Sequence, residues 1–354
     1  MLLGNIVGWD KGQDDLFNPL STRNRDDCLE PFRVLREVAL QHGIELHTPD
    51  LNALHKRTPD FNLYLESVPV DSKAPGLHCL IRFETELIVP INANKDYLDQ
   101  FDLIFTWDRV YLESSTGQGS PSSVSKPHLI EIRTPNPIPM PLSDKTPGFD
   151  ERSVFCCLIS TNRHANRNDP RELYSERVKA IHWFEKNAPH DFVLYGNGWT
   201  VPMRRFGGRG KALYRLEKIV NILLHRKAFP SYRGPVKEKQ AALKDAKFCI
   251  CYENAKDIPG YLTEKIFDCF ISGCVPVYWG APDVTEDIPE ACFIDFRKFA
   301  SYDDLYRYLK NMPEKEFSAY QDAAQDFLRS SQFLPHGSHA FAHTITKALL
   351  SAFN

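Results

Sequence analysis

The sequence lacks a strong net charge, a long apolar run and a CxxC pair of cysteines. The formal charge of the 354 residues is −3, whereas proteins that neutralise nucleic-acid phosphates are usually strongly basic. No stretch approaches the roughly 18 apolar residues of a membrane-spanning helix. The nine cysteines offer no zinc or redox spacing, and several lie in apolar runs, which favours reduced thiols. We expect a globular protein with no nucleic-acid partner, transmembrane segment or structural metal.

The N-terminal stretch lacks the features of a secretory signal. MLLGNIVGWDKGQDD has no basic lead, and Gly and Asp interrupt its apolar run early. These features predict a soluble, cytoplasmic protein, and they leave association with a membrane surface open.

The familiar glycine-rich phosphate cradles are absent as well. Neither GxGxxG nor GxxxxGK followed by Ser or Thr occurs in the chain. A basic block does occur, because twelve Lys and Arg stand between Met203 and Lys244 against only Glu217 and Glu238. A solvated helical surface is the favoured interpretation of this block. The alternative is a positive wall beside a phosphate-bearing ligand.

The length and patterning predict two α/β domains. A single core usually stops growing at roughly 250 to 300 residues, and this chain is longer. Strand-like and helix-like patterns alternate up to about residue 110. Residues 117–150 are rich in Ser and Pro and predict a linker, after which a second α/β set begins. The expected strands are Leu2–Val7, Ile44–His47, Leu63–Leu65, Cys79–Phe83, Leu103–Phe105, Phe155–Ser160, Phe192–Tyr195, Phe248–Tyr252 and Val275–Trp279, and the expected helices include 31–42, 172–186, 213–227, 236–246, 262–272 and 340–353.

The segment from Lys247 to Gly280 is the one whose pattern points to chemistry. An apolar strand, a polar loop with a Pro-Gly turn, a helix and a second apolar strand follow one another. In open α/β sheets, ligands bind outside the carboxyl ends of the strands, next to the following helix. The polar residues that fall at this place are Glu253, Asn254, Tyr261, Thr263, Glu264 and Lys265.

Lys265 occupies an unusual position, because the helix dipole disfavours a cation in a first turn by about 0.3 to 1 kcal/mol. A nearby anion would explain it, and a diphosphate held by the ammonium group and the helix amides would serve. Tyr261 stands four residues before Lys265 and three before Glu264, so the three are expected to share a helix face. A surface Glu-Lys pair on a core helix explains the spacing equally well.

YENAKDIPGYLTEKIFDCFISGCVPVYWG, residues 252–280, resembles the donor-binding signature of the α1,3/α1,4-fucosyltransferases, glycosyltransferase family 10. Residues 234–254 resemble the lead-in to this signature, and YGNGW from Tyr195 resembles another landmark of the family. FETELIVP at 83–90 and FDLIFTWD at 101–108 resemble its acceptor-domain segment. The matches span roughly residues 80 to 300.

The resemblance implies a GT-B fold, in which two Rossmann-like α/β domains face each other across a cleft. Residues 1–150 would bind the acceptor, and residues 151–335 would bind GDP-fucose. Residues 336–354 would form a C-terminal helix that could return to the first domain.

The resemblance also implies roles for single residues. Arg177 and Lys265 are assigned to the GDP diphosphate and Glu264 to the ribose. The fucose and phosphate side would be lined by Glu253, Asn254 and Tyr261. Thr263, Tyr195 and Gly196 would also belong to the donor-binding site.

Family members invert the anomeric configuration, so a carboxylate must deprotonate the acceptor hydroxyl. Glu86 best fits this position, with Glu84 as a rival that should share its face of one strand. The implied acceptor is a glycan of the N-acetyllactosamine type, with transfer to O3 of N-acetylglucosamine favoured and no obligatory metal. An alternative is a GT-B enzyme that uses another nucleotide-sugar donor.

Overall fold

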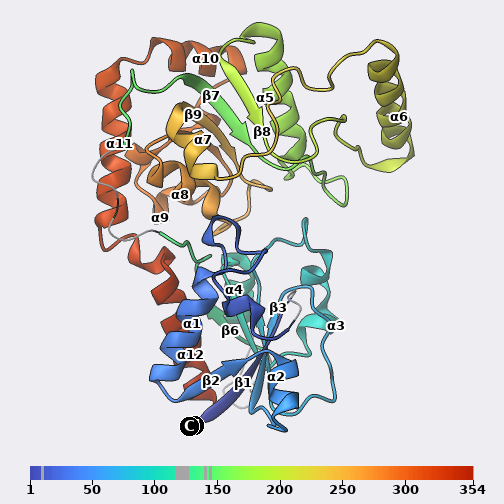
Figure 1. The fold of residues 1–354 in the computed structure, drawn as a ribbon, viewed down its shortest axis with the longest axis vertical. Helices are drawn as coiled ribbons and strands as arrows, with labels where there is room; N and C mark the ends of the chain where they lie inside the picture. Colours follow the sequence, from blue (N-terminus) through green and yellow to red (C-terminus); the bar gives the residue numbers. More distant parts are fainter. Residues whose placement is uncertain (9–11, 117–126, 139–141, 143–145, 354) are drawn as a thin grey trace. The chain divides into compact units, whose positions relative to one another are not determined.

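The computed structural model describes residues 1–8, 12–116, 127–138, 142 and 146–353 (Figure 1). The chain forms two compact units. The first comprises Met1–Pro139, Pro259–Tyr261 and Phe333–Asn354, and the second comprises Met140–Ile258 and Leu262–Gln332. Neither unit is a continuous piece of the sequence.

The first unit is built on a six-stranded parallel sheet with the order β2-β1-β3-β4-β5-β6. Its central strands are almost wholly buried, as expected for a parallel sheet that is covered on both faces. The strands are β1 (Leu2–Val7), β2 (Ile44–His47), β3 (Phe61–Leu65), β4 (Leu77–Ile81), β5 (Leu103–Thr106) and β6 (His128–Glu131).

Helices α1 (Glu30–Gln41) and α12 (Ser338–Ala352) lie side by side against this sheet (Figure 1). The C-terminal helix adds Phe341, Ile345 and Leu349 to the core of the first unit. The ring of Phe341 packs edge-on against Phe32 of α1, with centroids 6.5 Å apart. The remaining helices of the unit are α2 (Pro49–Leu54), α3 (Lys95–Leu98) and α4 (Arg109–Thr116).

The second unit has a five-stranded parallel sheet with the order β11-β10-β9-β7-β8. With β7 counted as strand 1 and the sheet read from the β8 edge, this is the doubly wound order 2-1-3-4-5. The direction of winding reverses between β7 and β9. The strands are β7 (Val154–Ile159), β8 (Phe192–Tyr195), β9 (Ala246–Tyr252), β10 (Val275–Trp279) and β11 (Ile294–Asp295). The helices are α5 (Tyr174–Asn187), α6 (Gly207–Leu223), α7 (Lys239–Asp245), α8 (Glu264–Ile271), α9 (Val284–Asp287), α10 (Tyr302–Asn311) and α11 (Glu314–Arg329).

The predicted α/β class and most of the predicted elements are confirmed, and three details were wrong. Strand β4 ends at Ile81, so it does not reach Phe83. The expected linker at 117–150 contains β6, a short strand with exposed ends that lacks an apolar run. The helix expected at 262–272 begins only at Glu264. Residues 117–126, 139–141 and 143–145 of that linker lie outside the described residues.

Candidate functional site

The carboxyl ends of β7 and β9 meet at the point where the winding of the second sheet reverses. Ser160 follows β7, and Glu253 and Asn254 follow β9. Such a point leaves a crevice in open α/β sheets, because the adjoining connections pass to opposite faces. The predicted residues of the second unit are gathered near this edge.

Glu253 is the centre of a buried polar cluster. Its side chain has no exposed surface. One carboxylate oxygen, Oε1, accepts from the backbone N–H of Thr263 at 2.9 Å. The other, Oε2, accepts from the Thr263 hydroxyl at 2.7 Å and from Lys265 Nζ at 3.1 Å. The ammonium group of Lys265 also donates to Thr263 Oγ1 at 2.8 Å.

This cluster explains why a lysine stands in the first turn of α8. The buried carboxylate of Glu253 supplies the negative charge that offsets the helix dipole there. The Lys265–Glu253 pair therefore forms without a diphosphate, and its Glu253 side is fully buried. Lys265 nevertheless keeps a quarter of its side chain exposed, so its ammonium group can be reached from solvent.

Gly280, after β10, is required by the cluster. A Cβ at this position would lie 2.5 Å from Glu253 Cγ and 2.4 Å from the hydroxyl of Tyr278. The backbone N–H of Glu253 donates to the carbonyl of Trp279 at 2.8 Å, which ties the ends of β9 and β10 together.

Glu264 lies beside Lys265 but in a different environment. Its side chain is 45% exposed, with Lys239 Nζ at 3.8 Å and Lys265 Nζ at 3.9 Å. Partial burial of the carboxyl group opposes ionisation, but the charges of Lys265 and Lys239 outweigh it and lower the pKa of Glu264 to about 2. Glu264 is therefore an ionised acceptor at neutral pH, open to hydroxyl donors from solvent.

Arg177 of α5 reaches the end of β9 from the other side of the site. It is 4% exposed, and its Nη2 donates to the carbonyl of Tyr252 at 2.7 Å and to Asn254 Oδ1 at 3.0 Å. The guanidinium group also lies over the ring of Tyr174, 5.2 Å from its centroid. These contacts fix a cation and an amide side by side at the carboxyl end of β9.

The loop after Tyr195 packs directly onto the loop after β7. Gly196 has a φ of +124°, and a Cβ there would lie 1.7 Å from the carbonyl oxygen of Ser160. The indole of Trp199 donates to the same oxygen at 2.7 Å. Glycine is therefore required at 196, because no side chain fits so close to the neighbouring backbone.

Tyr261 differs from its prediction. It precedes α8 and belongs to the first unit, so it does not share a helix face with Glu264 and Lys265. Its ring packs against Trp107 with centroids 4.9 Å apart, and its hydroxyl donates to Glu84 Oε2 at 2.6 Å. Gly260 makes this possible, since it has a φ of +78° and a Cβ there would lie 2.5 Å from the carbonyl oxygen of Trp107.

Glu84 and Glu86 lie in a loop after β4, so the prediction that they share a strand face was wrong. Sequence reasoning also missed Glu66, the residue that organises this loop. Glu66 is 4% exposed and lies at the end of β3. Its Oε2 accepts from the backbone N–H groups of Phe83 at 3.1 Å and Glu84 at 3.0 Å and from the amide of Asn92 at 2.8 Å. Burial raises the pKa of Glu66 despite these hydrogen bonds.

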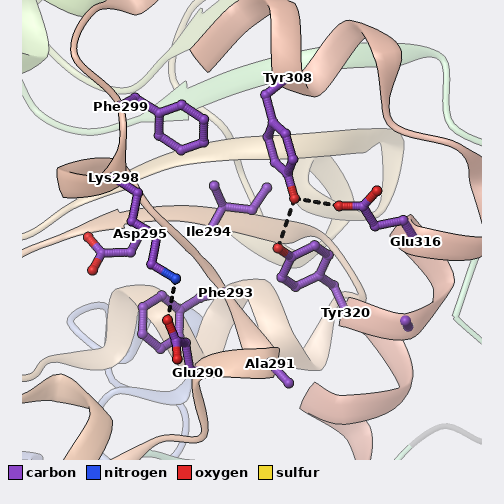
Figure 2. Close-up of a pocket in the computed structure, with 11 residues that line it drawn as sticks. Glu290, Ala291, Phe293, Ile294, Asp295, Lys298, Phe299, Tyr308, Glu316 and Tyr320 are labelled. Carbon is purple, nitrogen blue, oxygen red and sulfur yellow. Dashed lines mark hydrogen bonds and ion pairs between the residues drawn. The ribbon is translucent and has the colours of Figure 1, made fainter. Parts of the chain in front are cut away.

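A pocket of about 550 Å³ lies beside β11 in the second unit (Figure 2). Its polar side chains are engaged with one another, except for Asp295, which pairs with Arg297. The Tyr308 hydroxyl contacts Glu316 at 2.5 Å and the Tyr320 hydroxyl at 3.0 Å, and Lys298 pairs with Glu290. Since none of the residues predicted for the site line this pocket, it carries no part of the candidate chemistry.

Within the described residues, no group of three or more His, Cys, Asp or Glu side chains could hold a metal ion. None of the helices described there is both long and apolar enough to cross a membrane. All nine cysteines are free, and all but Cys28 are buried.

Residues 199–328 match the sequence model of "Glycosyltransferase family 10 (fucosyltransferase) C-term". The chain is 37% identical over 87 residues to "Alpha-(1,3)-fucosyltransferase FucT" of Helicobacter pylori, which is 25% of this chain and 18% of that protein. It is 32% identical over 125 residues to "4-galactosyl-N-acetylglucosaminide 3-alpha-L-fucosyltransferase 9" of Mus musculus, which is 34% of each chain. The matched part thus spans only 18% to 34% of the length of these relatives.

The fold likeness extends over the whole chain. Sucrose-phosphate synthase from Thermosynechococcus elongatus aligns with a TM-score of 0.55 and 12% identity, covering 100% of this chain and 99% of that one. Together with two doubly wound parallel sheets in one chain, this likeness shows the GT-B fold.

Proposed function

We propose that the chain, whose residues 199–328 match the C-terminal model of glycosyltransferase family 10, transfers L-fucose from GDP-fucose to a hydroxyl group of a glycan. One observation carries the proposal. The buried Glu253–Thr263–Lys265 cluster lies inside the matched segment and at the carboxyl end of β9, next to the winding reversal where α/β sheets bind nucleotides.

The diphosphate of the donor would be held by Lys265 and Arg177. Lys265 is oriented by Glu253 and Thr263 and still exposes part of its side chain. Arg177 uses Nη2 for Tyr252 and Asn254, and its Nε and Nη1 would serve a phosphate oxygen. Glu264, ionised and 45% exposed, would accept hydrogen bonds from the ribose hydroxyls. Asn254 and the Tyr195–Gly196 turn would line the remaining side of the donor.

Transfer would proceed in one displacement with inversion. The acceptor oxygen forms a bond to the anomeric carbon of fucose while the bond from that carbon to the β-phosphate oxygen breaks. GDP leaves with the electron pair, and Lys265, Arg177 and the amides of α8 stabilise its charge without an obligatory metal. A general base takes the proton of the acceptor hydroxyl.

We assign the base to Glu86 in the first unit. Its neighbour Glu84 already accepts a hydrogen bond from the hydroxyl of Tyr261, which gives Glu84 a structural role in that loop. Tyr261 thereby supports the acceptor side in this proposal. An N-acetyllactosamine-type glycan, fucosylated at O3 of N-acetylglucosamine, is the acceptor that the name of the mouse relative suggests.

The proposal is tested by a glycan-acceptor screen with GDP-fucose, followed by determination of the linkage in the product. We expect turnover with GDP-fucose that persists in a chelator, and none with GDP-mannose or UDP-sugars. Turnover with another nucleotide sugar and none with GDP-fucose would show that a different donor is used. Absence of turnover together with absence of GDP binding would refute the site.

The base assignment has its own test in a matched pair of variants. Glu86→Gln should lower kcat/KM by about 10²-fold or more, because a general base is lost, while GDP affinity stays within about twofold. Glu84→Gln is the control two residues away. The assignment fails if Glu86→Gln turns over normally, and the base is Glu84 if only that variant is inactive.

A further inference from the structure

Helix α6 differs from the other helices of the second unit in how little of it is buried. Of its 17 residues, only Gly210 is buried. Figure 1 shows α6 at the periphery of the second unit, away from the sheet. Contacts with the rest of the second unit therefore do not explain which residues α6 carries.

Large apolar side chains cluster on this helix in the open. Of the fifteen large apolar residues that are exposed in the described chain, eight lie between Phe206 and Leu224. Scattered exposed apolar residues are ordinary, but a contiguous group marks an interaction surface. The eight are Phe206, Leu213, Leu216, Ile219, Val220, Ile222, Leu223 and Leu224, with exposures from 39% to 70%.

Four of the apolar residues form a stripe along α6, whereas Ile222 lies on the side of Lys211, Arg215 and Lys218. Leu213, Leu216, Val220 and Leu223 follow the spacing of three and four residues that places side chains on one stripe. The side chains of α6 that are partly covered are those of Tyr214, Glu217 and Asn221, which carry polar groups. The helix is thus turned with its apolar stripe outward, the reverse of a helix that packs on its own domain.

The charges around this stripe are almost all positive. Between residues 204 and 227 the only acidic residue is Glu217, whose Oε2 lies 3.4 Å from Arg205 Nη2. Lys211, Arg215 and Lys218 share the face opposite the apolar stripe, again spaced by four and three residues. Eight cations in this segment are exposed: Arg204, Arg205, Arg209, Lys211, Arg215, Lys218, Arg226 and Lys227.

We propose that α6 binds the surface of an anionic lipid bilayer. An in-plane helix buries its apolar face at the boundary of head groups and acyl chains, and Lys and Arg on its other face bind anionic lipids. A second copy of the chain is a poorer occupant, because pairing two such helices would bring two strongly cationic surfaces together. An anionic lipid surface complements both the stripe and the charge.

The test is sedimentation of the 354-residue chain with vesicles of phosphatidylcholine alone or of phosphatidylcholine mixed with phosphatidylglycerol. We expect binding to the mixed vesicles and little to the neutral ones. Leu216→Ser/Leu223→Ser should weaken binding by about tenfold or more, since two inserted side chains are lost. Lys211→Gln/Lys218→Gln should weaken it by about fivefold for each cation removed.

The control is Leu54→Ser/Leu334→Ser, which removes two exposed leucines elsewhere and should bind as the wild type does. All four leucines are exposed, so these changes should leave the thermal unfolding temperature in place. Sedimentation velocity without lipid supplies the counter-test. The proposal is overturned by equal binding to both vesicle types, by unchanged binding of the α6 variants, or by a wild-type dimer that Leu216→Ser/Leu223→Ser dissociates.

Discussion

Replacing Glu253 by Gln tests the buried cluster most directly. The amide oxygen can still accept from Thr263 N–H, and the Thr263 hydroxyl can rotate to accept from the new NH₂ group. The hydrogen bond that Lys265 Nζ donates to Glu253 Oε2 at 3.1 Å is lost, because the ammonium group would then face the amide NH₂ group, which is also a donor. A hydrogen bond between charged groups contributes about 1.5 to 3 kcal/mol.

The expected loss of unfolding free energy is therefore about 2 to 3 kcal/mol. Removing one partner of a fully buried pair costs about 3 to 5 kcal/mol, but Lys265 is partly exposed and can turn towards water or Glu264. This estimate corresponds to a Tm lower by about 4 to 12 °C. Urea unfolding followed by circular dichroism measures it, with an unchanged m value as a check on two-state behaviour.

Glu264→Gln is the matched control, eleven residues away and adjacent to the same lysine. Its side chain is 45% exposed, so the loss should stay within the range of about 0 to 1 kcal/mol of a surface pair. The affinity for GDP, measured by titration calorimetry, should nevertheless fall by about tenfold in Glu264→Gln, although its stability changes little. A Glu253→Gln protein as stable as the wild type would show that Glu253 does not compensate Lys265, and the account of the cluster would be wrong.

Two further predictions concern single groups. Burial raises the pKa of Glu66 in the folded protein, so the folded state holds the proton of this carboxyl group more tightly than the unfolded state does. The free energy of unfolding should therefore decline as the pH rises from about 4.5 through the raised pKa. Urea unfolding measures this decline, which should be absent in Glu66→Gln. Gly196→Ala should lower the unfolding free energy by about 2 to 4 kcal/mol, because its Cβ would lie 1.7 Å from Ser160 O at a positive φ. Gly208→Ala, with open space around its Cβ, should be neutral or slightly stabilising, and equal effects of the two substitutions would contradict this explanation.

The β9–α8–β10 region could be predicted because its signals are local. An apolar run, a Pro-Gly turn and a second apolar run follow one another within about thirty residues, and the polar residues between them had to lie at the edge of the sheet. The position of Tyr261 could not be predicted in the same way. The turn at Gly260 diverts the chain before α8 begins, and spacing alone cannot separate that turn from a helix that starts three residues earlier.

Glu66 and β6 were missed for related reasons. Glu66 bonds to groups 17, 18 and 26 residues away, and nothing in its neighbouring sequence marks it. Strand β6 has four residues with exposed ends, so its place in the sheet depends on pairing with β5 instead of on its own apolarity. The outward face of α6 was equally hidden, because an amphipathic pattern is the same whether the apolar stripe faces in or out.

Helix α12 has a consequence for the order in which the chain can fold during synthesis. Phe341, Ile345 and Leu349 complete the core of the first unit, although they follow every residue of the second unit in the chain. Domains commonly fold in the order of synthesis, N-terminal first. Here the unit that is begun first can be completed only after the second has been made, and a fragment that stops near residue 139 would lack both α12 and Tyr261.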